Sequence, residues 1–166
     1  MSTLLNLKGE VIADAYALLA DDAPLPATGA VLVSLARWQA EAATLAAHAH
    51  PVAVKLPNTV DVLTLEAEVL SRPLLVLDFP AFGDGRAYSQ ARRLRDRRGY
   101  KGAIRATGAA VMADQLQMMA RSGLDEFALR ADQDVALCQR TLTAVRPLPY
   151  QPARDLRRAV FAARQP

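Results

Sequence analysis

The sequence predicts an α/β domain of about five parallel β-α units, arranged as an open sheet or as an incomplete TIM-barrel-like fold. Short, mainly apolar runs recur along the chain, and each is followed by a longer stretch with apolar side chains at helical spacing. Such alternation pairs strands in parallel through right-handed crossovers. Five units are too few to close an eight-stranded barrel on their own.

The N-terminal part predicts a β-hairpin. Leu4–Leu7 and Val11–Leu19 are mainly apolar and flank a short turn that contains Gly9. The loop Asp21–Gly29, rich in Pro, Gly and Asp, follows. Residues 1–28 are therefore expected to form a hairpin and loop that lie as a lid or an edge on the main fold.

The β-α units follow in order. The expected strands are Ala30–Ser34, Val52–Leu56, Leu74–Leu77, Ala103–Ala106 and Glu126–Leu129. The expected helices are Leu35–His48, Val60–Leu70, the stretch after an N-cap at Asp84, Met112–Ser122, and Asp132–Val145 with Asp132 as N-cap. Residues 1–150 are expected to form a single α/β domain, and 151–166 a basic C-terminal tail that includes the amphipathic segment Arg154–Arg164.

Composition narrows the classes of partner. The net charge is +3 and the pI about 9.3, and Arg provides 17 of the 20 basic residues. The planar fork of donors on Arg matches oxyanions, although the run Arg92–Arg98 is also typical of a solvated helix face. One cysteine, Cys138, excludes an intramolecular disulfide and favours a cytoplasmic location. No signal-like or membrane-spanning stretch is visible, and neither a membrane nor a nucleic-acid partner is expected.

Candidate site residues gather where the predicted strands end, because ligands of parallel α/β sheets bind at the carboxyl ends of the strands. Asp78 follows a buried run, where it could act as a general base, a metal ligand or a cap for nearby N–H groups. Asp84, Gly85 and Arg86 open a helix whose free N–H groups and dipole favour an anion, with Arg86 and Ser89 as donors. An ordinary capped helix start is the alternative.

Arg105 lies on a strand that is expected to be buried, so it needs an acidic partner, for which Asp78 and Asp84 are the expected choices. Two roles for Arg105 stay open: a structural ion pair and a clamp that holds a ligand. Asp114 and Gln115 open the next helix at the same edge. His48 and His50 do not share a helical face, so no metal site is expected. No cofactor is detected, because Tyr88 stands where GxGxxG needs its third Gly.

The run DFPAFGDGRAYSQARRLRDRRGYKGAIRATG, followed by DQL and RSGLDEFALRADQD, resembles a family of small bacterial proteins, a domain of unknown function. The resemblance covers about residues 29–150. The family carries the name of an oxidoreductase involved in sulfite reduction, and no catalytic residues come with it. Ser122 stands where the family often has Cys, which argues against a thiol-based redox role.

The resemblance implies a cytoplasmic accessory protein of sulfite reduction or sulfur assimilation. It would bind a small oxyanion or a partner enzyme, such as sulfite reductase, at the DFPAFGDGR loop. Two alternatives stay open. One is an oxidoreductase that uses NAD(P)H or flavin, and the other is a structural subunit whose homodimer completes the sheet. Whether the protein is an enzyme is left undecided by these motifs.

Overall fold

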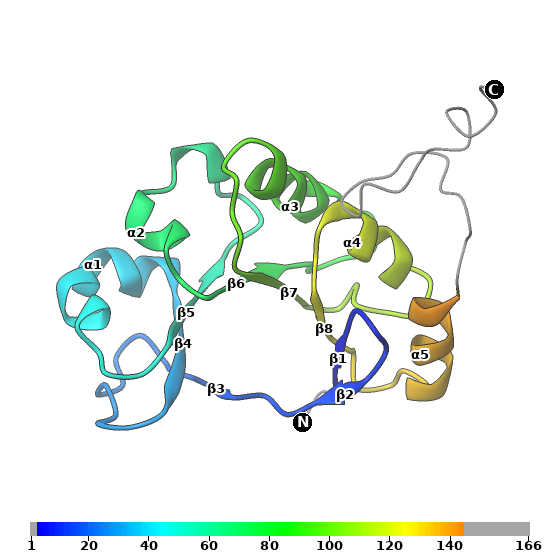
Figure 1. Ribbon diagram of the computed structural model, residues 1–166, viewed down its shortest axis with the longest axis horizontal. Coiled ribbons are helices and arrows are strands. Elements are labelled where there is room, and N and C mark those ends of the chain that lie inside the picture. The colour runs from blue at the N-terminus through cyan, green and yellow to red at the C-terminus, as the bar shows by residue number, and fades with distance from the viewer. Residues whose placement is uncertain (1–2, 145–166) are drawn as a thin grey trace.

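The computed structural model describes residues 3–144, and in this range eight strands form one sheet in the order β2-β1-β8-β7-β6-β5-β4-β3 (Figure 1). The strands are β1 (Leu4–Asn6), β2 (Val11–Ile12), β3 (Tyr16–Leu18), β4 (Ala30–Ser34), β5 (Val52–Leu56), β6 (Leu74–Asp78), β7 (Ala103–Thr107) and β8 (Glu126–Ala128). The helices are α1 (Leu35–Ala46), the 3-10 helix η1 (Val62–Thr64), α2 (Ala67–Leu70), α3 (Arg86–Asp96), α4 (Leu116–Ser122) and α5 (Val135–Thr143).

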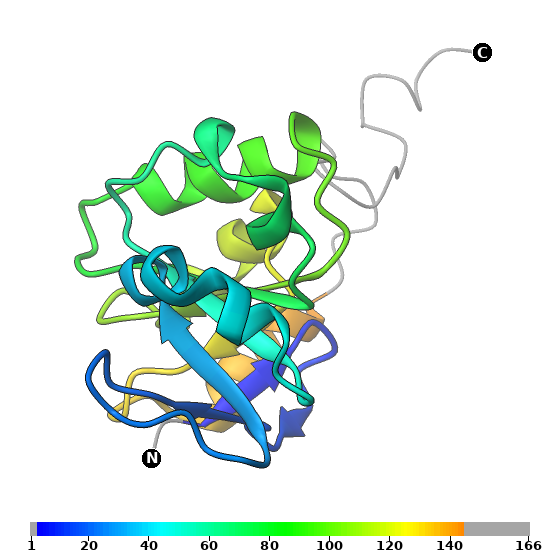
Figure 2. The same cartoon turned by 90° about the vertical axis from the view of Figure 1, so that its left-hand side faces the viewer.

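Strands β3 to β8 pair in parallel with their neighbours, whereas β1 pairs antiparallel with both β8 and β2. The helices lie along the outer side of the arc that the strands make (Figure 1). Figure 2 shows the same layering from the side, with α1 and α3 above the sheet. The mixed α/β class is thus confirmed.

The sheet must curl, and chain connectivity gives the reason. β2 and β3 occupy opposite ends of the strand order, yet only residues 13–15 separate them in sequence. Four Cα steps reach at most about 14 Å. The edge strands of a flat eight-stranded sheet would lie about 34 Å apart at the usual strand spacing. The short connection therefore forces the two edges toward each other and gives the sheet a concave inner face.

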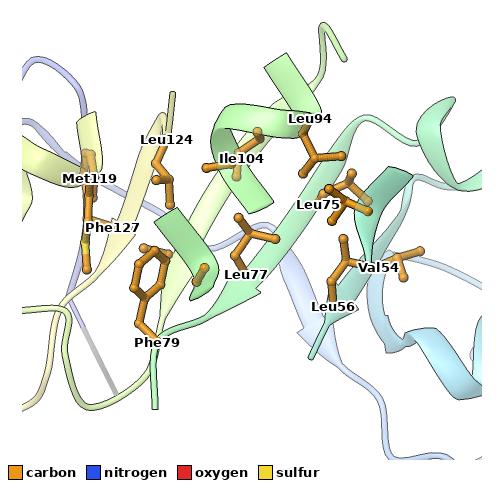
Figure 3. Close-up of a cluster of buried hydrophobic side chains, with 14 of the residues drawn as sticks. Val54, Leu56, Leu75, Leu77, Phe79, Leu94, Ile104, Met119, Leu124 and Phe127 are labelled. Atoms are coloured by element: carbon orange, nitrogen blue, oxygen red, sulfur yellow. The ribbon is translucent and has the colours of Figure 1, made fainter. Parts of the chain in front are cut away.

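The two faces of the sheet differ in chemistry. Alternate residues such as Leu75, Leu77 and Ile104 point outward and form the main core with the helices, where Figure 3 shows them near Leu94 of α3. On the concave face a smaller apolar cluster forms around Leu32, Ala53, Leu74 and Val76. The larger apolar area lies between the sheet and the helices, so the concave face is the one left for polar groups.

Strand positions agree closely with the sequence, whereas some helix starts do not. The predicted helix Val60–Leu70 is wrong as a single element, because the Asp61 side chain caps Leu63 and extended Leu65 separates η1 from α2. α4 begins at Leu116, not at Met112. Gly85 rather than Asp84 is the N-cap of α3, and Asp134 rather than Asp132 caps α5 by accepting from Leu137.

The N-terminal hairpin is present, since β1 and β2 pair antiparallel. Its predicted second arm, Val11–Leu19, is wrong as one strand. The Asp14 side chain accepts from the backbone N–H of Tyr16, and the chain leaves β2 there to form β3 at the other end of the sheet. The segment Arg154–Arg164 lies outside the described residues. None of the helices described between residues 3 and 144 is long and apolar enough to cross a membrane.

Candidate functional site

The loops that follow β5, β6 and β7 meet beside the start of α3. Residues 57–61 follow β5, residues 79–85 lead from β6 into α3, and residues 108–115 follow β7. These are the carboxyl ends of adjacent parallel strands, where α/β folds bind ligands. Most of the candidate residues identified from the sequence lie here, in two groups on either side of α3.

Asp84, Arg86 and Asn58 form a rigid polar unit at the start of α3. Arg86 donates from Nε to Asp84 Oδ1 at 2.9 Å and from Nη2 to Oδ2 at 2.6 Å, while its backbone N–H donates to Oδ1 at 3.2 Å. Asn58 Nδ2 donates to Asp84 Oδ2 at 2.6 Å. The Arg86 side-chain and backbone hydrogen bonds lower the pKa of Asp84 to about 2. The carboxylate therefore holds the guanidinium in one orientation next to the N-cap Gly85.

A pocket of about 340 Å³ lies between α3 and the loop after β5. Its polar lining comes from Asn58, Asp61, Arg86, Ser89, Gln90 and Arg93. Among residues 3–144, Arg93 is held only by a 3.6 Å ion pair with Asp61, and both side chains are about half exposed. The Ser89 hydroxyl has no hydrogen-bond partner among residues 3–144. We call this cavity the α3 pocket.

Gln90 forms part of the wall of the α3 pocket. Its side-chain Nε2 donates to the carbonyls of Pro57 at 2.8 Å and Val60 at 2.9 Å, which ties the loop to the helix. Because both N–H groups point at carbonyls, the orientation of the amide is determined. Gln90 is 4% exposed, and its Oε1 has no hydrogen-bond partner in the described part of the chain. A buried acceptor without a donor is uncommon in native structures.

On the other side of α3, Tyr88 links this helix to the residues before α4. Its hydroxyl donates to Gln115 Oε1 at 2.7 Å, and Gln115 Nε2 donates to Asp114 Oδ2 at 3.2 Å. The Tyr88 ring packs edge-on against Phe79, with centroids 5.0 Å apart. Burial, and secondly the charge of Asp114, raise the pKa of Tyr88. Asp114 and Gln115 thus belong to this link and not to the α3 pocket.

The concave face carries a second polar cluster. Lys55 Nζ lies 3.3 Å from Asp78 Oδ1, and both side chains are partly exposed. Asp78 pairs along the sheet with Thr107, so it lies two residues beyond the pair of Val76 with Arg105. The carboxylate of Asp78 is therefore the partner of a lysine on β5.

Arg105 does not pair with Asp78 or Asp84, contrary to the sequence-based expectation. Its Nη1 donates to Asp14 at 2.9 Å and its Nε donates to Glu126 at 2.8 Å, while its side chain is 4% exposed. Its guanidinium also lies 5.8 Å from the Tyr16 ring centroid. Asp14 lies in the segment that joins β2 to β3, and this segment was not expected to reach β7. Arg105 thus fastens the connection that curls the sheet.

The eight candidate site residues identified from the sequence therefore do not form one site. Arg86 and Ser89 line the α3 pocket, Asp84 and Gly85 precede them at the start of α3, and the other four candidates lie elsewhere. Sequence reasoning missed Arg93 and Gln90. Gln90 had a detectable signal, because it is a polar residue on the buried helix face formed by Ala87, Ala91 and Leu94. Within residues 3–144 no group of His, Cys, Asp or Glu has an arrangement that could hold a metal ion.

Fold and site together define an α/β protein whose polar pocket lies at the carboxyl edge of its parallel strands. A family model described as "Bacterial protein of unknown function (DUF934)" matches residues 53–161, and the chain belongs to this family. The match spans the loops after β5, β6 and β7 and helix α3. It confirms the resemblance to a bacterial domain of unknown function. Comparisons with curated proteins and with solved structures found no match.

Proposed function

We propose that this protein is a cytoplasmic accessory protein of sulfite reduction that binds a small oxyanion in the α3 pocket. The link to sulfite reduction rests on the family resemblance. The anion site rests on one observation, which is that the guanidinium groups of Arg86 and Arg93 and a hydroxyl without a partner in residues 3–144 line a pocket along one side of the 11-residue helix α3.

The two arginines suit different tasks in anion binding. Arg86 is oriented by its two bonds to Asp84, although its side chain is 57% exposed, so less side-chain entropy is lost when an anion contacts its remaining N–H groups. Arg93 is held loosely, because an exposed ion pair such as Arg93–Asp61 contributes only about 0–1 kcal/mol. An entering oxyanion can therefore compete with Asp61 for Arg93, while the Asp61 carboxylate stays in the pocket lining and opposes the negative charge. Ser89 adds a neutral donor, and the positive end of the helix dipole favours negative charge.

The direct test is a thermal-shift and calorimetric titration with sulfite, sulfate and phosphate, against sodium chloride at equal ionic strength. A ligand that binds only the folded state stabilises it by about 2.7 kcal/mol at a hundredfold excess over Kd. For a chain of this size, such stabilisation raises Tm by about 5–11 °C.

Arg93→Gln should abolish most of the shift, because it removes one of the two cations from the pocket. The matched control is Arg92→Gln, whose parent residue lies on the same helix, pairs with Asp96 and does not line the pocket. If no oxyanion stabilises the wild type more than chloride does, the proposed anion site is wrong.

The proposed partner is sulfite reductase or another enzyme of sulfur assimilation, and co-sedimentation with purified sulfite reductase tests it. The alternative of an oxidoreductase has less support at this site. Tyr88, in the position of the third Gly of a dinucleotide fingerprint, carries a bulky ring packed on Phe79. Adding NADPH, FAD and FMN to the same titration distinguishes the two functions.

A further inference from the structure

We propose that the oxyanion in the α3 pocket is the head group of a larger organic ligand, a phosphate or sulfate monoester whose carbon part carries hydroxyl or amino groups. This inference rests on the proposed function and names the ligand class of the same site. Three observations support it: a second pocket next to the first, the acidic and apolar lining of that pocket, and the buried oxygen of Gln90, which has no hydrogen-bond partner in the described residues.

The second pocket adjoins the α3 pocket. It measures about 270 Å³ and lies between α1 and the η1–α2 segment. Val60 and Asp61 line both cavities, so the two meet at the residues that precede η1. Each cavity is close in size to the lower end of the range for small-molecule sites, about 300–1,000 Å³. An inorganic oxyanion of four or five heavy atoms would fill only part of the first.

The chemistry of the second pocket differs from that of the first. It contains no basic residue, and Leu35, Leu65 and Val69 supply apolar walls. Glu66 and Gln39, which are both exposed, supply polar groups together with Asp61 and Thr64. A carboxylate accepts hydrogen bonds and repels anions. This half of the site therefore suits a neutral or amino-bearing carbon skeleton, while the guanidinium groups of the first half hold the charged end.

Gln90, which lines the α3 pocket, indicates that the ligand carries a hydrogen-bond donor close to its anionic group. Its Oε1 is an acceptor, so it would be satisfied by a donor such as a hydroxyl or amino group and not by the oxygens of a fully ionised oxyanion. The amide cannot turn its nitrogen toward the pocket without losing its bonds to Pro57 and Val60.

The experiment compares inorganic phosphate with glycerol 3-phosphate, ribose 5-phosphate and AMP by calorimetry on the full chain, and includes adenosine as a ligand without the anion. At least one monoester should bind about tenfold more tightly than phosphate, because added hydrogen bonds and apolar contact contribute to its affinity. Adenosine should bind more weakly than AMP. In ¹⁵N–¹H spectra the side-chain amide of Gln90 should shift more with that monoester than with phosphate.

Glu66→Ala should weaken binding of the monoester severalfold and leave phosphate binding unchanged. The control is Glu68→Ala, because Glu68 is an exposed acid on the same short helix that lines neither pocket. If phosphate binds as tightly as every monoester, or if Glu66→Ala has no effect on any of them, the larger ligand is excluded while the oxyanion site stands. If neither phosphate nor any monoester binds, the proposed function fails together with this inference.

Discussion

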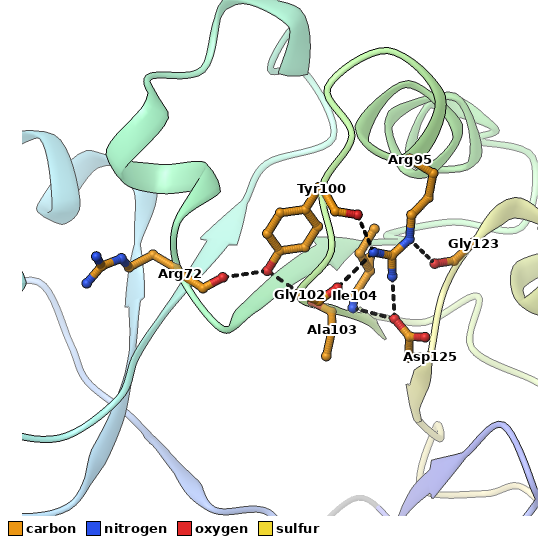
Figure 4. A network of polar contacts seen from close by, with 8 residues as sticks. All are labelled: Arg72, Arg95, Tyr100, Gly102, Ala103, Ile104, Gly123 and Asp125. Carbon is orange, nitrogen blue, oxygen red and sulfur yellow. Dashed lines mark hydrogen bonds and ion pairs between the residues drawn. The ribbon is translucent and has the colours of Figure 1, made fainter.

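Arg95 offers the sharpest test of what stabilises this fold. It lies on α3 with its side chain 10% exposed, and it reaches the end of α4 and the start of β7 (Figure 4). Its Nε donates to the carbonyl of Gly123 at 2.9 Å, and its Nη1 donates to those of Tyr100 and Gly102, each at 2.8 Å. Its Nη2 donates to the carboxylate of Asp125. One guanidinium thus joins three parts of the chain.

Arg95→Ala should lower the free energy of unfolding by about 3–5 kcal/mol, because it removes a guanidinium that contacts a largely buried carboxylate and three backbone carbonyls. Asp125 would keep its hydrogen bond from the backbone N–H of Ile104, at 2.9 Å. Because of this bond, we expect the loss of unfolding free energy to lie near the lower end of that range. For a chain of this length the corresponding fall in Tm is about 6–20 °C.

Urea unfolding followed by circular dichroism measures the effect, and the m-value should stay constant while the midpoint falls. The control is Arg92→Ala, since Arg92 forms only an exposed pair with Asp96, worth about 0.3–0.5 kcal/mol. Arg95→Lys should rescue little, because a single ammonium cannot reproduce the fork that contacts three carbonyls and a carboxylate. Equal stability of the Arg95→Ala and Arg92→Ala variants would refute the reasoning.

Three further predictions concern the curled sheet, a loop and the α3 pocket. In a double-mutant cycle, Arg105→Met and Asp14→Asn should be coupled by about 0.5–3 kcal/mol, because their ion pair fastens the β2–β3 connection to β7; additive effects in urea unfolding would contradict this. Gly108→Ala should destabilise by more than about 2 kcal/mol, because Gly108 has a φ of +112° and a Cβ there would clash with the backbone of the loop after β6. Gly29→Ala, at a φ of +95° with open space around it, should cost less in the same assay. Carboxylate NMR should find that Asp84 titrates near pH 2. Since this pKa lies below the unfolded value, the Asp84 contribution to stability is complete above about pH 4 and is lost as the pH falls through 2, whereas a midpoint near 4 would show that the pair with Arg86 does not persist in solution.

Much of the local structure could be predicted from the sequence, because it depends on neighbouring residues. The mainly apolar runs at Val52–Leu56, which includes Lys55, and at Leu74–Leu77 became the largely buried strands β5 and β6, since strands buried on both faces are rich in apolar side chains. The same reasoning placed Asp84, Gly85, Arg86 and Ser89 together at the start of α3. The family, too, could be identified from the run that begins at Asp78.

Only the tertiary structure decided how distant segments meet. The hairpin at the N-terminus was visible in the sequence as two apolar runs. The sequence did not show that β1 pairs with β8 while β3 pairs with β4 at the opposite end of the sheet. This arrangement places Asp14 beside Arg105, 91 residues away in sequence. Hydrophobic spacing determines which residues are buried, whereas the pairing of strands depends on long-range contacts that leave no local signal. The pairing of strands determines which group lies next to a buried charge. It also determines that α3 and the loop after β5 lie side by side and form a pocket.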